Sequence, residues 1–375
     1  MKRIIRKFIL YANVVVAVFL ILSFLSSRLS PEKIWFPAFI GLAYPYILLV
    51  NVLFLLGWII LQRKELLISL LAIFLGWGTL TDYFSLRPFR FIKKGRYINM
   101  VREQRNADYQ LKLLSFNVHG FDFYRRGDNP SAQAEILSFI QDEDPDVLCL
   151  QEFHSSDRAG YREKDVYDKF DHLPNRHISY PSSSQNLGYG IATFSHYPII
   201  QRGSVPLEYR YSLCIYSDIL IDQDTFRVYN CHLQSINLDS EQYQILDSLK
   251  FRYDNQQIEE IKDISFRLRS AFIKRAAQAD IIAAHVSNCP HPVIICGDFN
   301  DTPVSYTYHT IKDGLQDAFS GSGWGLGRTY NGEFPSFRID YILHSESIEA
   351  MFFSREKVRL SDHFPIIGYL KVKEE

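Results

Sequence analysis

Residues 293–300 read Val-Ile-Ile-Cys-Gly-Asp-Phe-Asn, an apolar run that ends in a glycine followed by polar side chains. A short apolar run bounded by glycine is typical of a buried β-strand. Asp298 and Asn300 are separated by one residue, so in an extended segment their side chains leave the backbone on the same side. The stretch therefore predicts a core strand with a carboxylate and an amide at its carboxyl end.

The same arrangement of polar side chains at the end of an apolar strand recurs along the chain. The other places are Asn117 after 113–116, Gln151 and Glu152 after 147–150, His232 after 228–231, Asp340 at the start of 340–343, and Asp362 and His363 before 364–367. A single carboxylate after a strand is usually a cap or a turn residue, but that explanation does not account for the whole set. Because strand ends meet at one edge of a sheet, we expect these side chains to converge on one site.

Helical and extended patterns alternate between these strands. Apolar residues recur at helical spacing over 132–141 and again over 266–286. Further strands are expected at 190–194, 212–221 and 364–372. Many short strands with helices between them indicate an α/β or α+β layered domain.

The residue types at the strand ends suit a phosphoester site that binds a hard metal ion. Mg²⁺ prefers oxygen ligands and usually takes few protein carboxylates, which Glu152 and Asp362 would supply. Asp298 would orient and deprotonate an attacking water. His363 would bind a phosphate oxygen if Asp340 held its tautomer. These residues together predict hydrolysis of a phosphoester.

Taken in order, the motifs resemble those of the endonuclease/exonuclease/phosphatase superfamily. They are Ser115-Phe116-Asn117-Val118, Gln151-Glu152, Cys231-His232-Leu233, Gly297-Asp298-Phe299-Asn300, Asp340-Tyr341-Ile342 and Ser361-Asp362-His363. Each motif alone is weak, but the ordered set is specific and extends over residues 111–372. The resemblance implies a four-layer α/β sandwich, in which two packed β-sheets are flanked by helices. It also implies hydrolysis of a phosphoester that depends on Mg²⁺ or Mn²⁺.

The resemblance assigns a metal group and two further positions. It implies that Glu152 is the main metal ligand, that Asn117 supports the same site, and that Asp362 is a further metal-site carboxylate. His119 stands where some members carry an aspartate, which weakens the case for a second, fully liganded metal. His119, and Arg275 on the helix before residue 293, are candidate substrate contacts, although a solvated helix face explains Arg275 equally well.

The resemblance also implies a catalytic group. Asp298 and Asn300 correspond to the pair that orients water and contacts phosphate, and Asp340 and His363 to the oriented histidine pair. His232 matches the histidine of the deoxyribonuclease I-like and sphingomyelinase-like branches, and would protonate the leaving oxygen.

The amino-terminal quarter of the chain has a different composition. Residues 1–96 carry 13 Lys or Arg and 3 Asp or Glu, a charge of +10, whereas residues 97–375 carry 28 and 39, a charge of −11. Uncharged apolar runs at 8–25, 34–61 and 66–80 approach or exceed the length that crosses a bilayer. A cleaved signal peptide and buried soluble helices explain them less well. We therefore expect about three transmembrane helices in 1–86, a basic and polar linker at 87–110, and a catalytic domain at 111–375.

The charges that flank the apolar runs give two opposing signals for the side of the membrane on which the body lies. Six basic residues in 2–7 and 63–64 favour a cytoplasmic amino terminus, so three crossings would place the body outside the cytoplasm. Five basic residues in 87–96 favour the opposite arrangement. The expectation is a multi-pass protein of the cell membrane with an extracytoplasmic catalytic domain.

Charge also bears on the substrate and partners. Binding of duplex DNA depends on Lys and Arg that neutralise phosphates, and the body is acidic. The expected substrate is therefore a lipid headgroup or small phosphoester, and the expected partner of the first helices is the lipid bilayer. A membrane-anchored nuclease acting on DNA or RNA is the alternative, and a catalytically silent binding or scaffold member is a second one. The five cysteines show no CxxC spacing, which argues against a zinc site.

Overall fold

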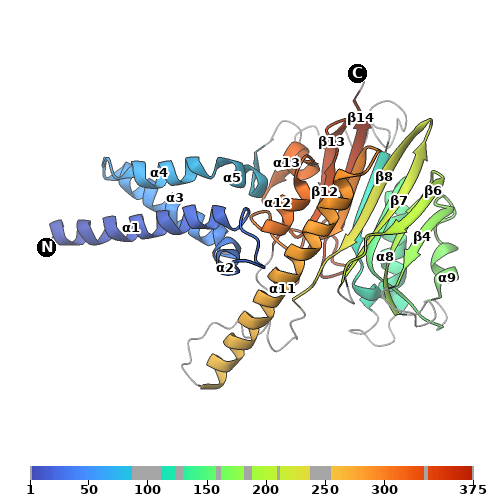
Figure 1. The fold of residues 1–375 in the computed structure, drawn as a ribbon, viewed down its shortest axis with the longest axis horizontal. Helices are drawn as coiled ribbons and strands as arrows, with labels where there is room; N and C mark the ends of the chain where they lie inside the picture. The colour runs from blue at the N-terminus through green and yellow to red at the C-terminus, as the bar shows by residue number, and fades with distance from the viewer. Residues whose placement is uncertain are drawn as a thin grey trace.

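The computed structural model describes residues 2–86, 111–122, 130–157, 162–180, 188–208, 212–236, 255–332 and 337–373. The predicted linker at 87–110 lies outside these ranges. Figure 1 shows a group of helices at the amino-terminal end and a body of β-sheets with helices on the outside. The body helices are α8 (Pro130–Glu143), α9 (Glu163–Tyr167), α11 (Asn255–Ser287), α12 (Tyr306–Lys312) and α13 (Ala318–Ser322), with a short 3₁₀ helix, η1 (His119–Asp122).

Two six-stranded mixed sheets form the body. The first has the order β10-β12-β9-β8-β7-β6 and the second the order β13-β14-β2-β3-β5-β4. The first comprises β6 (Ile199–Ser204), β7 (Leu213–Ile221), β8 (Asp224–His232), β9 (Val293–Asp298), β10 (Gln316–Asp317) and β12 (Asp340–His344). The second comprises β2 (Leu111–Asn117), β3 (Val147–Ser155), β4 (Asn175–Ser179), β5 (Gly188–Ser195), β13 (Ile348–Arg355) and β14 (Ile366–Val372). Each sheet has one parallel pair, β8 with β9 and β2 with β3.

The apolar residues form three layers of core. Leu113 and Cys149 of the second sheet pack against Ile294 of the first, between the two sheets. The outer face of the second sheet is covered by α8, which buries Ile136, and the outer face of the first by α11, which buries Ile282. Because each sheet is covered on both faces, central strands such as β2, β3 and β9 are buried along almost their whole length. The predicted four-layer α/β sandwich is confirmed.

The amino-terminal helices are more broken than their apolar runs predict. They are α1 (Lys2–Leu25), α2 (Phe36–Leu42), α3 (Tyr44–Ile60), α4 (Leu66–Leu75) and α5 (Trp77–Tyr83). The run at 34–61 bends by 61° between α2 and α3, where Pro45 lies in the first turn of α3, and the run at 66–80 bends by 70° at Gly76. Proline is tolerated at a helix start but not in its interior. Within the described residues, Ile4–Leu25 alone is long and apolar enough to cross a membrane as a single helix, and each bent pair qualifies if counted as one span.

Hydrogen bonds join the helices to the body. The two-residue strand β1 (Ser85–Leu86) pairs with β11 (Trp324–Gly325) in an antiparallel sheet. Ser26 Oγ, just after α1, donates to the carbonyl oxygen of Val304 at 2.7 Å. The side chain of Val304 belongs to the same apolar cluster as residues of α1 and α3. The two parts therefore share a sheet and a core.

A buried ion-pair network reinforces this contact. Arg338 donates to Asp317 Oδ2 and to the carbonyl oxygen of Asp82, each at 2.7 Å. The Asp82 carboxylate forms an ion pair with Lys312 of α12. Because Arg338 and Asp317 are both fully buried, each charge depends on the other for compensation.

Candidate active site

Strand register sets three of the predicted residues in a row. The parallel pairing of β8 with β9 puts His232 beside Asp298, and the antiparallel pairing of β9 with β12 puts Asp340 on the other side of Asp298. His232 and Asp298 end their strands, and Asp340 begins its own. The ends of three neighbouring strands of the first sheet therefore carry a histidine and two carboxylates next to each other.

Asp298 is held by donors from both sheets. Its Oδ1 accepts the backbone N–H of Asn300 at 2.7 Å, and its Oδ2 accepts the side-chain amides of Asn300 and Asn117, each at 3.1 Å. Asn117 ends β2 in the second sheet. Gly297 has a φ of 130°, and a Cβ there would lie 2.0 Å from the Cys231 carbonyl oxygen, so only glycine fits. The Asp298 side chain, 1% exposed, thus joins the two sheets.

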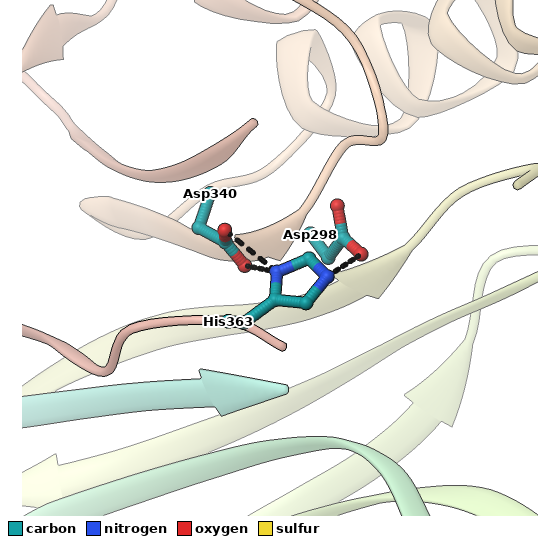
Figure 2. Close-up of side chains that lie close together, drawn as sticks. All are labelled: Asp298, Asp340 and His363. Atoms are coloured by element: carbon teal, nitrogen blue, oxygen red, sulfur yellow. Dashed lines mark hydrogen bonds and ion pairs between the residues drawn. The ribbon is translucent and has the colours of Figure 1, made fainter. Parts of the chain in front are cut away.

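Figure 2 shows the imidazole of His363 between the carboxylates of Asp340 and Asp298. Nδ1 lies 2.9 Å from Asp340 Oδ2, and Nε2 lies 3.6 Å from Asp298 Oδ2. Burial lowers the pKa of His363, but the charges of Asp340 and Asp298 outweigh burial and raise that pKa well above its ordinary value. The ring therefore holds its proton at neutral pH, with Nδ1–H bonded to Asp340 and Nε2–H facing Asp298 at 3.6 Å, beyond hydrogen-bond distance.

The protonation of Asp298 is shifted in the direction that base catalysis needs. Burial raises the pKa of Asp298 to about 6, and the positive charge of His363 opposes this shift. A general base works best when its pKa lies near the operating pH. Asp298 is thus ionised at neutral pH and able to accept a proton.

Glu152 reaches the site through an irregularity in β3. The register of β3 with β5 shifts between Leu150 and Phe153, and Glu152 has a φ of 50°. A β-bulge re-aims a side chain, and strained backbone of this kind clusters at functional sites. Glu152 Oε1 accepts the amide of Asn117 at 3.2 Å. Asn117 therefore bridges the carboxylates of Glu152 and Asp298.

His232 faces the same space. Its Nε2 lies 3.5 Å from Glu152 Oε1 and 3.9 Å from Asp298 Oδ2. This nitrogen is buried and has no hydrogen-bond partner among the described residues. Because an unpaired buried polar group costs free energy, a ligand bound between the two carboxylates would stabilise this arrangement.

The donors around this space fit a hard divalent cation. Asp298, Asp340 and His363 each offer a ligand atom, and these atoms lie within 4.8 Å of one another. However, Nδ1 of His363 is bonded to Asp340, so we read these three as a hydrogen-bonded acid–base unit. Glu152 then remains as the oxygen donor that Mg²⁺ or Mn²⁺ prefers.

Asp362 and His119 lie together beside these carboxylates. His119 Nδ1 is 3.6 Å from Asp362 Oδ1, and both side chains are partly exposed. The backbone N–H of His119 donates to Asn117 Oδ1 at 3.0 Å, so the amide nitrogen of Asn117 faces Glu152. Asn117 is therefore placed to orient the Glu152 carboxylate.

The structure does not place Arg275 as a substrate contact. Its side chain, 1% exposed, donates to Asp301 Oδ2 at 3.1 Å and to the carbonyl oxygen of Gln234 at 3.0 Å. Gln278 accepts the backbone N–H of Gln234 at 3.0 Å. Arg275 thus holds the segments that follow β8 and β9, because its charge is fully used inside the protein. The sequence analysis did not single out Asp301, although its position directly after Asn300 places it next to the predicted site.

Comparisons with solved structures find similar folds at low identity. An endonuclease/exonuclease/phosphatase from Beutenbergia cavernae is 17% identical, with 71% of this chain and 72% of that chain covered and a TM-score of 0.48. The mannosyl-6-phosphatase of Bacteroides thetaiotaomicron is 18% identical, with 69% and 99% covered and a TM-score of 0.49. Truncated TDP2 of Caenorhabditis elegans is 18% identical, with 70% and 98% covered and a TM-score of 0.47.

Family models divide the chain in the same way as its composition. No curated protein matches the chain. A model described as a domain of unknown function matches residues 6–83. The model of the Endonuclease/Exonuclease/phosphatase family matches residues 114–363, well over half of the chain, and this range contains every site residue from Asn117 to His363. The chain therefore belongs to the endonuclease/exonuclease/phosphatase family, whose members are phosphoester hydrolases.

Proposed function

We propose that this protein is a membrane-tethered, divalent-cation-dependent phosphodiesterase that acts on a lipid headgroup or another small phosphoester. The observation that carries the proposal is a chain of contacts at the strand ends of the two sheets. His363 lies between Asp340 and Asp298, and both His232 and Asn117 lie between Asp298 and Glu152. A hydrogen-bonded acid–base unit next to an oxygen donor for a metal is the combination that phosphoester hydrolysis needs. The intact set argues against a catalytically silent scaffold.

Each side chain has a role that its environment supports. Glu152 and Asp362 would hold Mg²⁺ or Mn²⁺, which when bound stabilises negative charge on phosphate oxygens. Asp298 orients the attacking water and takes its proton. Protonated His363, held by Asp340, donates a hydrogen bond to a phosphate oxygen.

His232 is placed to act on the leaving oxygen of the phosphoester. Its Nε2 has no hydrogen-bond partner among the described residues and faces the space between Glu152 and Asp298. We assign it to protonate the leaving oxygen. Asn300, whose backbone and side-chain amides both bond Asp298, keeps that carboxylate fixed and lies where it can contact phosphate.

The amino-terminal helices support the membrane tether, because they are polar inside and apolar outside. Asn13 donates to Ser69 Oγ at 2.7 Å, Ser69 donates to Asn51 Oδ1 at 3.1 Å, and Trp58 donates to Asn13 Oδ1 at 2.9 Å. All four side chains are buried, whereas many Leu, Ile, Val and Phe side chains of the same helices are exposed, such as Leu53. Interhelical hydrogen bonds within an apolar exterior are typical of transmembrane bundles. We therefore propose three spans, with α2–α3 and α4–α5 each forming one.

Charges at the two ends of this bundle support an extracytoplasmic body. Arg6 near the start of α1 forms an ion pair with Glu65 just before α4, so the amino terminus and the α3–α4 loop lie at one end. Arg63 and Lys64 are in the same loop. Cytoplasmic loops carry an excess of Lys and Arg, and the body joins the opposite end.

The test uses the full chain reconstituted in liposomes. We expect hydrolysis of bis(p-nitrophenyl) phosphate and of vesicle phospholipid with Mg²⁺, loss of both with excess EDTA, and loss of both in Glu152→Gln. Glu349→Gln, a partly exposed position on β13, is the matched control and should retain activity. Turnover that survives saturating chelator would contradict the mechanism. Nicking of supercoiled plasmid DNA by the wild type, with no hydrolysis of phospholipid, would instead favour the tethered nuclease.

A further inference from the structure

The amino-terminal half of α11 extends beyond the sheets that its other half covers. Ala279 and Ile282 in the carboxyl-terminal half are buried against the first sheet. Ile258, Ile261 and Phe266 are 43%, 48% and 67% exposed. Figure 1 shows the amino-terminal end of α11 pointing away from the sheets, on the side where the amino-terminal helices lie. A helix of this length spans about 50 Å, and the body covers only part of it.

The exposed half of α11 is amphipathic in a particular way. At 3.6 residues per turn, Ile258, Ile261, Lys262, Phe266 and Arg269 fall within an arc of about 140°. The acidic residues of this half, Glu259, Glu260 and Asp263, lie on the rest of the circumference. A helix that combines exposed apolar side chains with Lys and Arg is typical of helices that lie at a membrane surface and contact anionic headgroups.

The same face is continuous with a contact that the structure already makes. The ring of Phe272 packs edge-on against Phe39 of α2, with centroids 5.3 Å apart. One turn earlier, the guanidinium of Arg269 lies 4.8 Å from the centroid of the Trp35 ring. Trp35 and α2 follow α1 at the end of the bundle that joins the body. The face therefore starts at the end of the membrane bundle and continues outward past it.

We propose that residues 258–269 of α11 lie on the bilayer surface, with Ile258, Ile261 and Phe266 at the boundary of headgroups and acyl chains. The inference rests on the proposed membrane tether and deepens it. Residues of a helix anchored at the end of a transmembrane bundle are already at the level of the headgroups. Lys262 and Arg269 then face lipid phosphates, which complement their charge.

This placement points to one class of substrate. The same helix carries Arg275 and Gln278, which hold the backbone of Gln234, two residues beyond His232. The active site is thus positioned by a helix that rests on the bilayer, and the substrate is a phosphodiester in the headgroups of that bilayer.

The test measures the depth of two side chains. Full-length protein carrying Cys289→Ser is spin-labelled at Ile261→Cys or, as a matched control on the opposite face, at Asp263→Cys. Each is reconstituted in liposomes of phosphatidylcholine and phosphatidylglycerol. Protein that carries Cys289→Ser alone, treated with the same label, measures the background. We expect collisions of the label at 261 with oxygen to exceed those with an aqueous nickel chelate, and the reverse at 263. Equal access of the chelate to both labels would overturn the proposal.

Two further outcomes separate the explanations. Dipolar broadening of the label at 261 that disappears on dilution with unlabelled protein would identify a second copy of the chain as the occupant, and would overturn the proposal. Flotation of the liposomes tests the tether by itself. A chain that floats while its label at 261 is aqueous has the tether without the surface helix, whereas a chain that does not float lacks both.

A kinetic test uses the double variant Ile258→Ser, Ile261→Ser. Hydrolysis of vesicle phospholipid should fall by more than tenfold, because the loss of two apolar side chains from an interface costs more free energy than a tenfold change. Hydrolysis of bis(p-nitrophenyl) phosphate should not change. Equal losses on both substrates, or no loss on either, would overturn the proposal.

Discussion

The amino-terminal bundle and the two-sheet body differ in the polar groups that they bury. Between α1, α3 and α4 the buried polar residues are neutral, and the amide of Asn13 links Ser69 with Trp58. The body also buries charged residues in pairs, as in the two-bond contact of Arg227 with Asp218 at 2.6 and 2.7 Å. The apolar side chains of the body lie in its interior, where their burial holds the two sheets and the helices together. The bundle exposes its apolar side chains, so polar bonds inside it help to specify how the helices pack.

The comparison also explains where reactivity lies. A buried charge that is fully paired is inert, whereas a buried group with an incomplete set of partners can exchange protons or bind a ligand. His232, whose Nε2 has no hydrogen-bond partner among the described residues and lies 3.9 Å from Asp298 Oδ2, is of the second kind. The predictions below test this distinction, from the largest expected effect to the smallest.

Replacing Asp298 by asparagine should abolish most activity and leave the fold intact. Loss of a general base typically lowers the rate by about 10²–10⁴-fold, and the amide keeps the size of the side chain. Turnover of bis(p-nitrophenyl) phosphate and the thermal midpoint of the full chain are measured together. Asp224→Asn, an exposed position at the other end of β8, should be indistinguishable from the wild type. Unchanged turnover in Asp298→Asn would exclude its role as base.

Breaking the buried pair between Arg338 and Asp317 should affect stability strongly. Arg338→Met leaves the Asp317 carboxylate buried without its partner, which costs about 3–5 kcal/mol. Arg267→Met, which removes an exposed pair with Asp263 on α11, should cost about 0.3–0.5 kcal/mol. Thermal unfolding in detergent compares them. Equal losses would mean that burial does not distinguish the two pairs.

Breaking the polar network of the bundle should have a moderate effect. Asn13→Leu removes the bonds to Ser69 and Trp58, and interhelical hydrogen bonds in membranes contribute about 0.6–2 kcal/mol. Leu53→Ala, on the exposed apolar surface, should change stability much less. Unfolding in nanodiscs provides the measurement. A greater loss in Leu53→Ala would reverse the assignment of the inside and outside of the bundle.

Acid should destabilise the body through two histidines that burial keeps neutral. Burial lowers the pKa of His154 and of His177 to about 4, below the value of about 6.5 in an unfolded chain. The unfolded state binds more protons between these values, so stability falls as the pH decreases from about 6.5 to about 4. The thermal midpoint is followed over this range. The double variant His154→Asn, His177→Asn should show a shallower decrease, and an identical decrease would show that other groups are responsible.

The local pattern predicted a layered α/β domain with polar residues at its strand ends, and the resemblance to the endonuclease/exonuclease/phosphatase superfamily added the four-layer sandwich, which the structure confirms. The catalytic and metal-binding roles of the strand-end residues stay predictions. A short apolar run predicts a buried strand, and a polar residue at its end lies at a sheet edge, as Asn117, His232 and Asp298 do. The direction of a side chain within an irregular strand is not encoded in that pattern. The left-handed backbone of Glu152 depends on how β3 pairs with β5.

Two other features were beyond the sequence for similar reasons. The burial of the Arg275 side chain depends on Asp301 and Gln234. These residues are 26 and 41 residues away along the chain and contact Arg275 only in the folded protein. The bends in the amino-terminal helices occur at Pro45 and Gly76, but hydropathy averages over such residues. In each case a contact or a single backbone position overrides a pattern that spans many residues.

The small sheet of β1 and β11 decides where the chain can be cut. A fragment that begins at residue 111 would lack β1, so β11 at Trp324 would become an unpaired edge, which invites aggregation. It would also lack the carbonyl group of Asp82 that Arg338 binds. The catalytic domain is therefore best expressed together with α1–α5. Poor solubility of a truncated form would reflect the loss of β1 from the β1–β11 sheet rather than instability of the two-sheet body.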